Sequence, residues 1–244
     1  MSESHAETSW KSNFLAAFNA TQKVEPVKNM NSLISFDHVY LAFDGRKILK
    51  NLSLDVRRGE KVVVLAKSGS GKSSLFSLVL GFLEPDAGRV FFAGQLVDAK
   101  SVWGIREKIA YIDQDVSLGD GKIPDLLDFV LKLKANSRLD GAREHLQELL
   151  RYFEFDQDVL TKNVENLSGG ERQRLAIIVA VLLQRKIFLL DEVTSALDKQ
   201  LKKKVADFFL AREDWTCLVI SHDPVWLENP AVKIFNLGEG KWKP

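Results

Sequence analysis

The sequence contains almost no cysteine and no long apolar run. Its only thiol, Cys217, cannot form a disulfide within the chain, which excludes a disulfide framework and favours a reducing compartment such as the cytoplasm. The longest apolar stretches, at residues 75–83 and 175–183, fall well short of the roughly 18 residues that a membrane-spanning helix requires. We therefore expect a soluble cytoplasmic protein that does not cross a membrane.

A bias toward charge of one sign is also absent. The 34 Lys and Arg residues nearly balance the 33 Asp and Glu residues, which gives a net charge of +1. Such a balance provides no general attraction to nucleic acid, and no nucleic-acid partner is expected. With 244 residues, of which 45% are hydrophobic, the chain has the length and composition of a globular protein with a sizeable core.

Residues 1–31 are polar and lack a secretory signal, because acidic residues come first and no long apolar segment follows. Their composition favours a disordered tail. The alternative is a short amphipathic docking helix at 9–20, since four apolar side chains recur there at helical spacing. These side chains belong to Trp10, Phe14, Leu15 and Phe18. The main domain is predicted over residues 32–240.

The main domain alternates between strand and helix patterns. Short strands from Leu33 to Val56, interrupted by the hairpin dipeptide Asp44-Gly45, predict an antiparallel lobe. An apolar strand at 61–66 leads through a glycine loop into a helix, which is typical of a βα unit. Helical periodicity between about 117 and 165 predicts a helical insert. Further strands are expected at 89–92, 108–112, 187–190, 217–220 and 232–237, and helices at 75–82, 170–183 and 199–212.

The glycine loop has the chemistry of a Walker A phosphate loop. Gly69 and Gly71 let backbone amides approach a phosphate chain, while Lys72 supplies a cation and Ser73 a hydroxyl for Mg²⁺. The alternative is a flexible loop with one solvated lysine. The loop consists of Ala66, Lys67, Ser68, Gly69, Ser70, Gly71, Lys72, Ser73 and Ser74, with Ala66 where the full pattern has glycine.

Two acidic residues, Asp191 and Glu192, end an apolar strand. The carboxyl end of a parallel strand faces the crevice where α/β sheets bind ligands. There Asp191 could hold Mg²⁺ through water while Glu192 activates a water for attack. The alternative is that the pair begins a helix, because acidic residues stabilise helix amino termini.

A second anion nest is predicted at Leu167-Ser168-Gly169-Gly170-Glu171, which opens a helix. One nucleotide does not need two nests at opposite ends of one domain. If the second nest meets the γ-phosphate held by another subunit, a head-to-tail dimer with ATP between the subunits is required.

With these motifs, residues 33–240 resemble the ATP-binding cassette (ABC) ATPases. Leu-Ser-Gly-Gly-Glu resembles the signature motif of that family, although Glu171 replaces the commoner Gln. Other matching positions are Phe43 as the adenine-stacking aromatic, Gln114 as the Q-loop, Ser195-Ala-Leu-Asp198 as the D-loop and His222 as the switch histidine. Taken singly, Phe43 could be a core residue, Gln114 a loop amide and His222 a helix-start residue.

The resemblance implies an α/β P-loop NTPase cassette with a mainly parallel core sheet, an antiparallel β lobe and an inserted helical subdomain. It implies ATP and Mg²⁺ as ligands. The implied catalytic residues are Glu192, His222, Gln114 and Lys72, and the implied metal ligands are Ser73, Gln114 and Asp191. Phe43 and Ala66–Ser74 would bind ATP in one subunit, and Ser168, Gly169, Gly170, Glu171 and Asp198 would reach it from the other.

The resemblance also implies the energy-coupling subunit of a transporter, held on the cytoplasmic face of a membrane by a permease. The second cassette would be an identical subunit, and the groove formed by Gln114 and the 117–165 insert would receive permease helices. The motifs look most like small subunits associated with iron or metal export. Two rival readings are a soluble scaffold, for example in iron-sulfur cluster assembly, and a nucleotide-gated clamp, against which the intact Glu192 and His222 argue.

Overall fold

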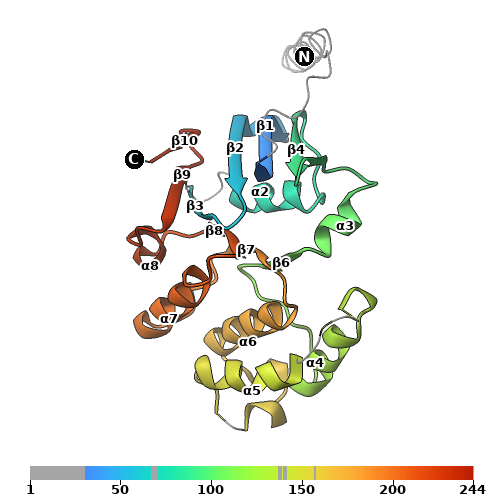
Figure 1. Ribbon diagram of the computed structural model, residues 1–244, viewed down its shortest axis with the longest axis vertical. Coiled ribbons are helices and arrows are strands. Elements are labelled where there is room, and N and C mark those ends of the chain that lie inside the picture. The colour runs from blue at the N-terminus through green and yellow to red at the C-terminus, as the bar shows by residue number, and fades with distance from the viewer. Residues whose placement is uncertain (1–30, 67–70, 137–138, 140–141, 157, 244) are drawn as a thin grey trace. The chain divides into compact units, whose positions relative to one another are not determined.

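The computed structural model of this chain describes residues 31–66, 71–136, 139, 142–156 and 158–243 (Figure 1). They divide into two compact units. Unit 1 includes the chain up to Arg57 and residues 68–101, and unit 2 includes residues 58–67 and 102 onward. The tail and the amphipathic helix predicted before Asn31 lie outside the described residues.

Unit 1 contains a four-stranded antiparallel sheet in the order β2-β1-β4-β5. Asp44 and Gly45, both with positive φ, form the two-residue turn between β1 and β2, so the predicted hairpin is confirmed. The helix α2 (Lys72–Val79) buries its apolar side chains and contacts β4. The strands are β1 (Ser32–Phe43), β2 (Arg46–Arg57), β4 (Ala87–Phe92) and β5 (Gln95–Leu96).

Unit 2 contains a six-stranded sheet in the order β10-β9-β3-β8-β7-β6. All neighbouring strands are parallel except β10 and β9, which form an antiparallel edge. The central strands β7 and β8 are buried along their whole length, which explains their continuous apolar sequences. The strands are β3 (Lys61–Leu65), β6 (Ile109–Ile112), β7 (Ile187–Asp191), β8 (Thr216–Ile220), β9 (Val232–Asn236) and β10 (Lys241–Trp242).

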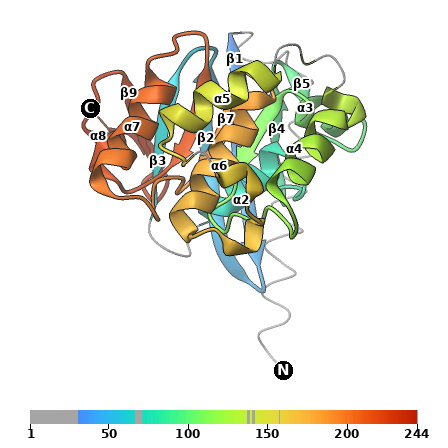
Figure 2. The ribbon, with the colours of Figure 1, turned by 90° about the horizontal axis from the view of Figure 1, so that it is seen from below.

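The helices of unit 2 are α3 (Val102–Arg106), α4 (Ile123–Lys132), α5 (Ala142–Tyr152), α6 (Gly169–Leu182), α7 (Lys199–Leu210) and α8 (Pro224–Leu227). Between residues 117 and 165 the described residues form α4, α5 and three short 3₁₀ turns, joined by one bridge between Lys122 and Asn163. The turns are Lys134–Asn136, Val159–Thr161 and Val164–Asn166. The helices α5 and α6 lie side by side (Figure 2).

Some boundaries differ from the sequence-based expectations. The helix expected from Leu75 begins at Lys72, because its first turn is polar and gives no apolar periodicity. The helix expected to reach residue 212 ends at Leu210. The short elements β5, β10, α3 and α8 were not expected, since two to five residues are too few to set a period.

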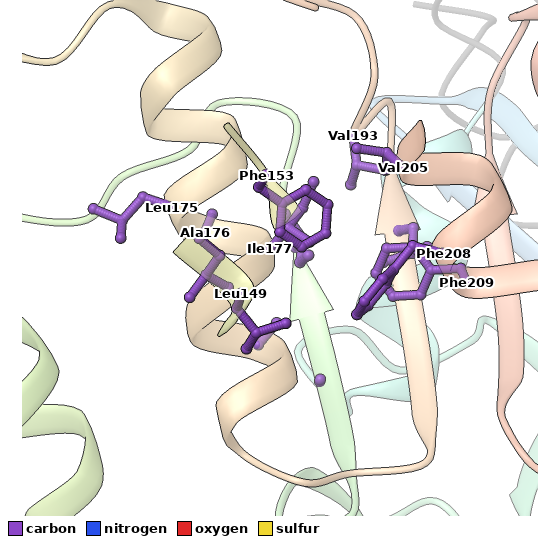
Figure 3. Close-up of a cluster of buried hydrophobic side chains, with 14 of the residues drawn as sticks. Leu149, Phe153, Leu175, Ala176, Ile177, Val193, Val205, Phe208 and Phe209 are labelled. Carbon is purple, nitrogen blue, oxygen red and sulfur yellow. The ribbon is translucent and has the colours of Figure 1, made fainter. Parts of the chain in front are cut away.

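The core of unit 2 packs α5, α6 and α7 with apolar side chains, among them Leu149, Ile177 and Phe209 (Figure 3). Phe153 meets Phe208 edge-to-face with ring centroids 5.0 Å apart, and Phe188 meets Phe209 in the same way at 5.1 Å. Each buried Phe contributes about 1.5–3 kcal/mol relative to an exposed position. These aromatic contacts pack α7 against β7, the strand that carries Asp191, and against Phe153, which follows α5.

None of the helices in the described part of the chain combines the length and the apolar character that crossing a bilayer requires.

Candidate functional site

The phosphate loop starts in unit 2 and ends in unit 1. Ala66, directly after β3, is buried, and Lys67, Ser68, Gly69 and Ser70 lie outside the described residues. Gly71 precedes α2 with φ +92°, and a Cβ added there would lie 2.3 Å from Cγ2 of Ile48. Position 71 therefore requires glycine for both its backbone conformation and its space.

The amino terminus of α2 suits an anion. Gly71 gives the helix no side-chain cap, and the first turn contains no acidic residue. Lys72, Ser73 and Ser74 occupy that turn. Backbone amides at such a terminus point outward and favour negative charge.

Phe43 ends β1, immediately before the Asp44-Gly45 turn. Its side chain is 43% exposed. An exposure this large excludes the reading of Phe43 as a core residue and leaves its ring available for stacking.

Asp191 and Glu192 lie at the carboxyl end of β7. Asp191 is 1% exposed. Glu192 has φ 47°, and its backbone amide donates to the carbonyl of Ile220, 2.9 Å away, at the end of β8. The next helix begins only at Lys199, which excludes the reading of this pair as a helix start. A left-handed backbone at a non-glycine residue costs on the order of 1–3 kcal/mol and is typical of functional sites.

Ser168 and Glu171 form a capping box at the start of α6. The Glu171 amide donates to Ser168 Oγ at 3.2 Å, and the Ser168 amide donates to Glu171 Oε2 at 2.8 Å. The hydrogen bond from the Ser168 backbone lowers the pKa of Glu171 below its ordinary value. The pattern Ser-x-x-Glu is a sequence signal for this box, so the box could have been predicted from the sequence.

The signature glycines pack against the D-loop within unit 2. A Cβ added at Gly170 would lie 3.0 Å from the carbonyl oxygen of Ala196, and one added at Gly169 would lie 3.9 Å from the Ala196 side chain. A larger residue at position 170 would displace the backbone of the D-loop. Close packing therefore favours glycine at 170, in addition to any role in binding an anion.

Gln173 is a further residue of this region that the sequence patterns do not indicate. It is 2% exposed. Its Nε2 donates to the carbonyl oxygen of Glu192 at 3.1 Å, and its Oε1 accepts from the Ala196 amide at 3.1 Å. A single glutamine in a helix gives no periodic signal, so only the tertiary structure identifies it.

His222 follows β8, and its Nε2 lies 2.8 Å from the carbonyl oxygen of Ala66. The adjacent Asp223 caps α8 and forms an ion pair of 2.8 Å with Lys202 of α7. Trp226 Nε1 donates to Thr194 Oγ1 at 3.3 Å. These contacts join the loop after β8 to the loop after β7 and to the start of the phosphate loop.

The remaining predicted residues have local roles in unit 2. Gln114 is exposed, and its backbone amide donates to Asp113 Oδ1 at 2.8 Å. Asp198 caps α7 by accepting from the amides of Gln200 and Leu201, each at 2.9 Å. Burial, with Asp113 nearby, raises the pKa of the Tyr111 phenol above its usual value.

The structure thus brings several predicted residues of unit 2 together. The carboxyl ends of β3, β8 and β7, which are adjacent parallel strands, place Ala66, His222, Asp191 and Glu192 along one edge of the sheet. Phe43 and Gly71–Ser74 belong to unit 1.

The residues predicted to hold Mg²⁺ offer a carboxylate, a hydroxyl and an amide oxygen. In the described part of the chain, no group of three or more His, Cys, Asp or Glu side chains could hold a metal by itself. Mg²⁺ commonly binds through one or two protein oxygens together with phosphate oxygens and water. Asp191 and Gln114 of unit 2 and Ser73 of unit 1 each offer an oxygen donor of the type that Mg²⁺ prefers.

A family model described as "ABC transporter" matches residues 49–195. The chain is 33% identical over 187 residues to a protein of Escherichia coli named "Probable iron export ATP-binding protein FetA", and covers 81% of that protein's length with 75% of its own. It is 31% identical over 221 residues to an ATP-dependent lipid A-core flippase of Haemophilus influenzae, with 86% of this chain matched. It spans 37% of the flippase's length.

A solved structure of a dimeric bacterial ABC transporter cassette superimposes with a TM-score of 0.74 at 26% identity, over 86% of this chain and 97% of that one. The fold class expected from the sequence, an α/β cassette of the P-loop type, is confirmed by this similarity.

Proposed function

Because the chain belongs to the ABC transporter family, whose members are ATP-hydrolysing enzymes, we propose that it binds ATP and hydrolyses it to energise a membrane transporter. The observation that carries this proposal is the single sheet edge shared by Ala66, His222, Asp191 and Glu192. The phosphate loop begins at this edge, and a carboxylate and an imidazole stand beside it, as nucleotide hydrolysis requires.

In the proposed reaction, Glu192 accepts the proton of a water molecule as the water oxygen attacks the γ-phosphorus. The bond from the γ-phosphorus to the bridging oxygen of ADP breaks, which gives ADP and phosphate. Lys72 and the amides of the phosphate loop stabilise the charge on the phosphates, and His222 contacts the γ-phosphate. The backbone bonds of Glu192 to Ile220 and Gln173 hold the base in position for this step.

Mg²⁺ would be held by Asp191, Ser73 and Gln114 together with the phosphates of ATP. When bound, it neutralises part of the negative charge that develops on the phosphate oxygens. The buried position of Asp191 favours an electrostatic role, because charges interact more strongly away from bulk water.

We also propose that two copies of the chain enclose two ATP molecules and reopen after hydrolysis. Ser168, Gly169 and Gly170 would contact the γ-phosphate held by the other subunit. In each subunit Glu171 and Asp198 act as helix caps, and their carboxylates shape this surface rather than bind phosphate. The similarity to a dimeric cassette supports the dimer.

The proposed membrane partner is a permease whose cytoplasmic helix binds beside the Q-loop. In unit 2, a cleft of about 200 Å³ lies between α6 and the segment from β6 to residue 118. Its lining includes Val116, Leu118, Val179 and Leu183, so it offers an apolar surface next to Gln114. Phe129 on α4, 65% exposed, adds an apolar side chain to the helical insert.

The name of FetA supports iron or another metal ion as the transported substrate. The resemblance of the motifs to subunits of metal export agrees with this. The flippase, whose name gives a lipid, is similar to this chain at nearly the same identity. Identity therefore does not separate the two cargo classes.

A Glu192→Gln variant tests the proposal. The amide keeps the shape of the side chain but cannot accept a proton, so we expect ATP binding to persist, turnover to fall by about 10²–10⁴-fold and an ATP-loaded dimer to accumulate. Phosphate release and sedimentation measure these effects. Wild-type turnover in the variant would refute the assignment of the base.

Copurification with an integral membrane protein from detergent-solubilised membranes distinguishes a transporter subunit from a soluble scaffold.

A further inference from the structure

Gln173 connects two parts of unit 2 that would serve different ATP molecules. It lies on α6, two residues after the capping box at Ser168–Glu171. Its amide contacts the loop after β7 three times: Nε2 reaches the carbonyl of Glu192 at 3.1 Å and Ser195 Oγ at 3.4 Å, and Oε1 accepts from the Ala196 amide at 3.1 Å. The side chain is buried.

We propose that Gln173 is a positioning residue that makes the signature end of α6 and the loop bearing Glu192 move as one piece. This inference rests on the proposed function, in which Ser168 contacts the ATP of the partner while Glu192 acts on the chain's own ATP. Engagement of the signature residues at one ATP would then set the position of the base at the other.

The chemistry of the amide explains why a glutamine is needed here. The Glu192 carbonyl accepts from a donor and the Ala196 amide donates to an acceptor, and an amide of this length offers both groups on one uncharged end. The two partners also fix which end of the amide carries the oxygen. A replacement that lacks either the donor or the acceptor leaves at least one of these buried backbone groups without this bond, which is costly.

A second contact supports the same connection. Gly170, at the start of α6, packs closely against the backbone of Ala196, where an added Cβ would lie 3.0 Å from the carbonyl oxygen. The helix is therefore joined to the D-loop at two points, Gly170 and Gln173. A bound phosphate that displaced α6 would therefore also displace Ala196 and the Glu192 backbone, because α6 contacts both directly.

A Gln173→Met variant provides the test, since methionine has a similar length but neither a donor nor an acceptor amide. We expect turnover at saturating ATP to fall by about 5–150-fold, the usual range of coupling effects. ATP affinity and ATP-driven dimerisation should stay within about twofold of the wild type, because no group that contacts ATP is removed. The matched control is Thr216→Val, which removes the buried bond from the Gly59 amide and should lower stability without lowering turnover.

A Gln173→Glu variant adds a readout that loss of packing would not produce. The introduced carboxylate can still accept from Ala196 but cannot donate to Glu192, whereas its protonated form can do both. Activity relative to the wild type should therefore rise as the pH falls. This variant also serves if Gln173→Met does not fold.

The outcomes separate the two proposals. A wild-type chain that neither binds nor hydrolyses ATP would refute the proposed function itself. If the wild type turns over, the inference is overturned by a folded Gln173→Met variant with unchanged turnover. A flat pH profile for Gln173→Glu relative to the wild type would overturn it as well, as would a loss of turnover in the Thr216→Val control equal to that in Gln173→Met.

Discussion

The imidazole Nε2 of His222 lies 2.8 Å from the carbonyl oxygen of Ala66. The two residues follow β8 and β3, which are parallel neighbours in the sheet of unit 2. The contact uses the backbone of Ala66, so it does not depend on the side chain that distinguishes this loop from one that begins with glycine. Replacement of glycine by alanine at position 66 is thus compatible with a histidine held at the start of the phosphate loop.

A His222→Ala variant should bind ATP with nearly unchanged affinity but hydrolyse it about 10²–10³-fold more slowly, the usual cost of removing one group that stabilises a transition state. Phosphate release at saturating ATP and equilibrium nucleotide binding measure the two effects. The control is His145→Ala on α5, an exposed position outside the site. Equal turnover in the His222→Ala variant and the wild type would contradict a role for His222 in hydrolysis.

Removal of the Phe43 ring tests its proposed contact with adenine. Phe43→Ala should weaken ATP binding by about 1–3 kcal/mol, the scale of base stacking on an aromatic side chain. Affinity for inorganic triphosphate should not change, because the phosphate loop is intact. Phe82→Ala, another exposed aromatic position in unit 1, is the control and should leave both affinities unaltered. An unchanged ATP affinity in Phe43→Ala would rule out the stacking role.

The capping box predicts a pH effect that can be assigned to Glu171. Its pKa is lowered in the folded chain by the bond from the Ser168 backbone, so its contribution to stability is present above the unfolded-state pKa and is lost as the pH falls through the folded-state value. In Glu171→Gln the amide oxygen accepts the same bond at every pH. Chemical denaturation of the two proteins between about pH 7 and pH 3 should show that only the wild type loses this increment.

A Ser168→Ala variant provides the comparison for Glu171, since it removes the other half of the box. It should lower the free energy of unfolding by about 1 kcal/mol over the whole pH range. If the stability of wild type and Glu171→Gln changed in parallel on acidification, the carboxylate would not be the group responsible.

The sequence was most informative where a local pattern carries the structure. The apolar runs of β3, β7 and β8 and the Asp44-Gly45 turn could be predicted because periodicity and turn chemistry depend on adjacent residues. Gln173 could not be predicted, since its partners lie 19 to 23 residues away in sequence. The helix starts expected at 170 and 199 lie within one residue of those of α6 and α7, so the caps formed by Glu171 and Asp198 could have been predicted from local sequence.

The shared nucleotide site gives the last prediction, which concerns Lys72 and Ser168. Lys72 belongs to unit 1 and Ser168 to unit 2, and the proposed dimer requires them to act on the same ATP only from opposite chains. Lys72→Ala removes the cation for the phosphates, and Ser168→Arg fills the signature nest with a bulky side chain. Each variant alone damages both sites of a symmetric dimer.

A mixed dimer with one substitution in each chain differs from both parents. The two lesions then fall on one composite site, and the other site keeps a wild-type Lys72 and a wild-type Ser168. Mixing the two inactive proteins should therefore restore part of the ATPase activity, provided that one intact site can turn over alone. Sedimentation of the mixture with ATP shows whether mixed dimers form. A wild-type chain and a Glu192→Gln variant that both stay monomeric at high concentration with saturating ATP, with and without the permease, would refute the shared site, since no closed dimer would exist to contain it.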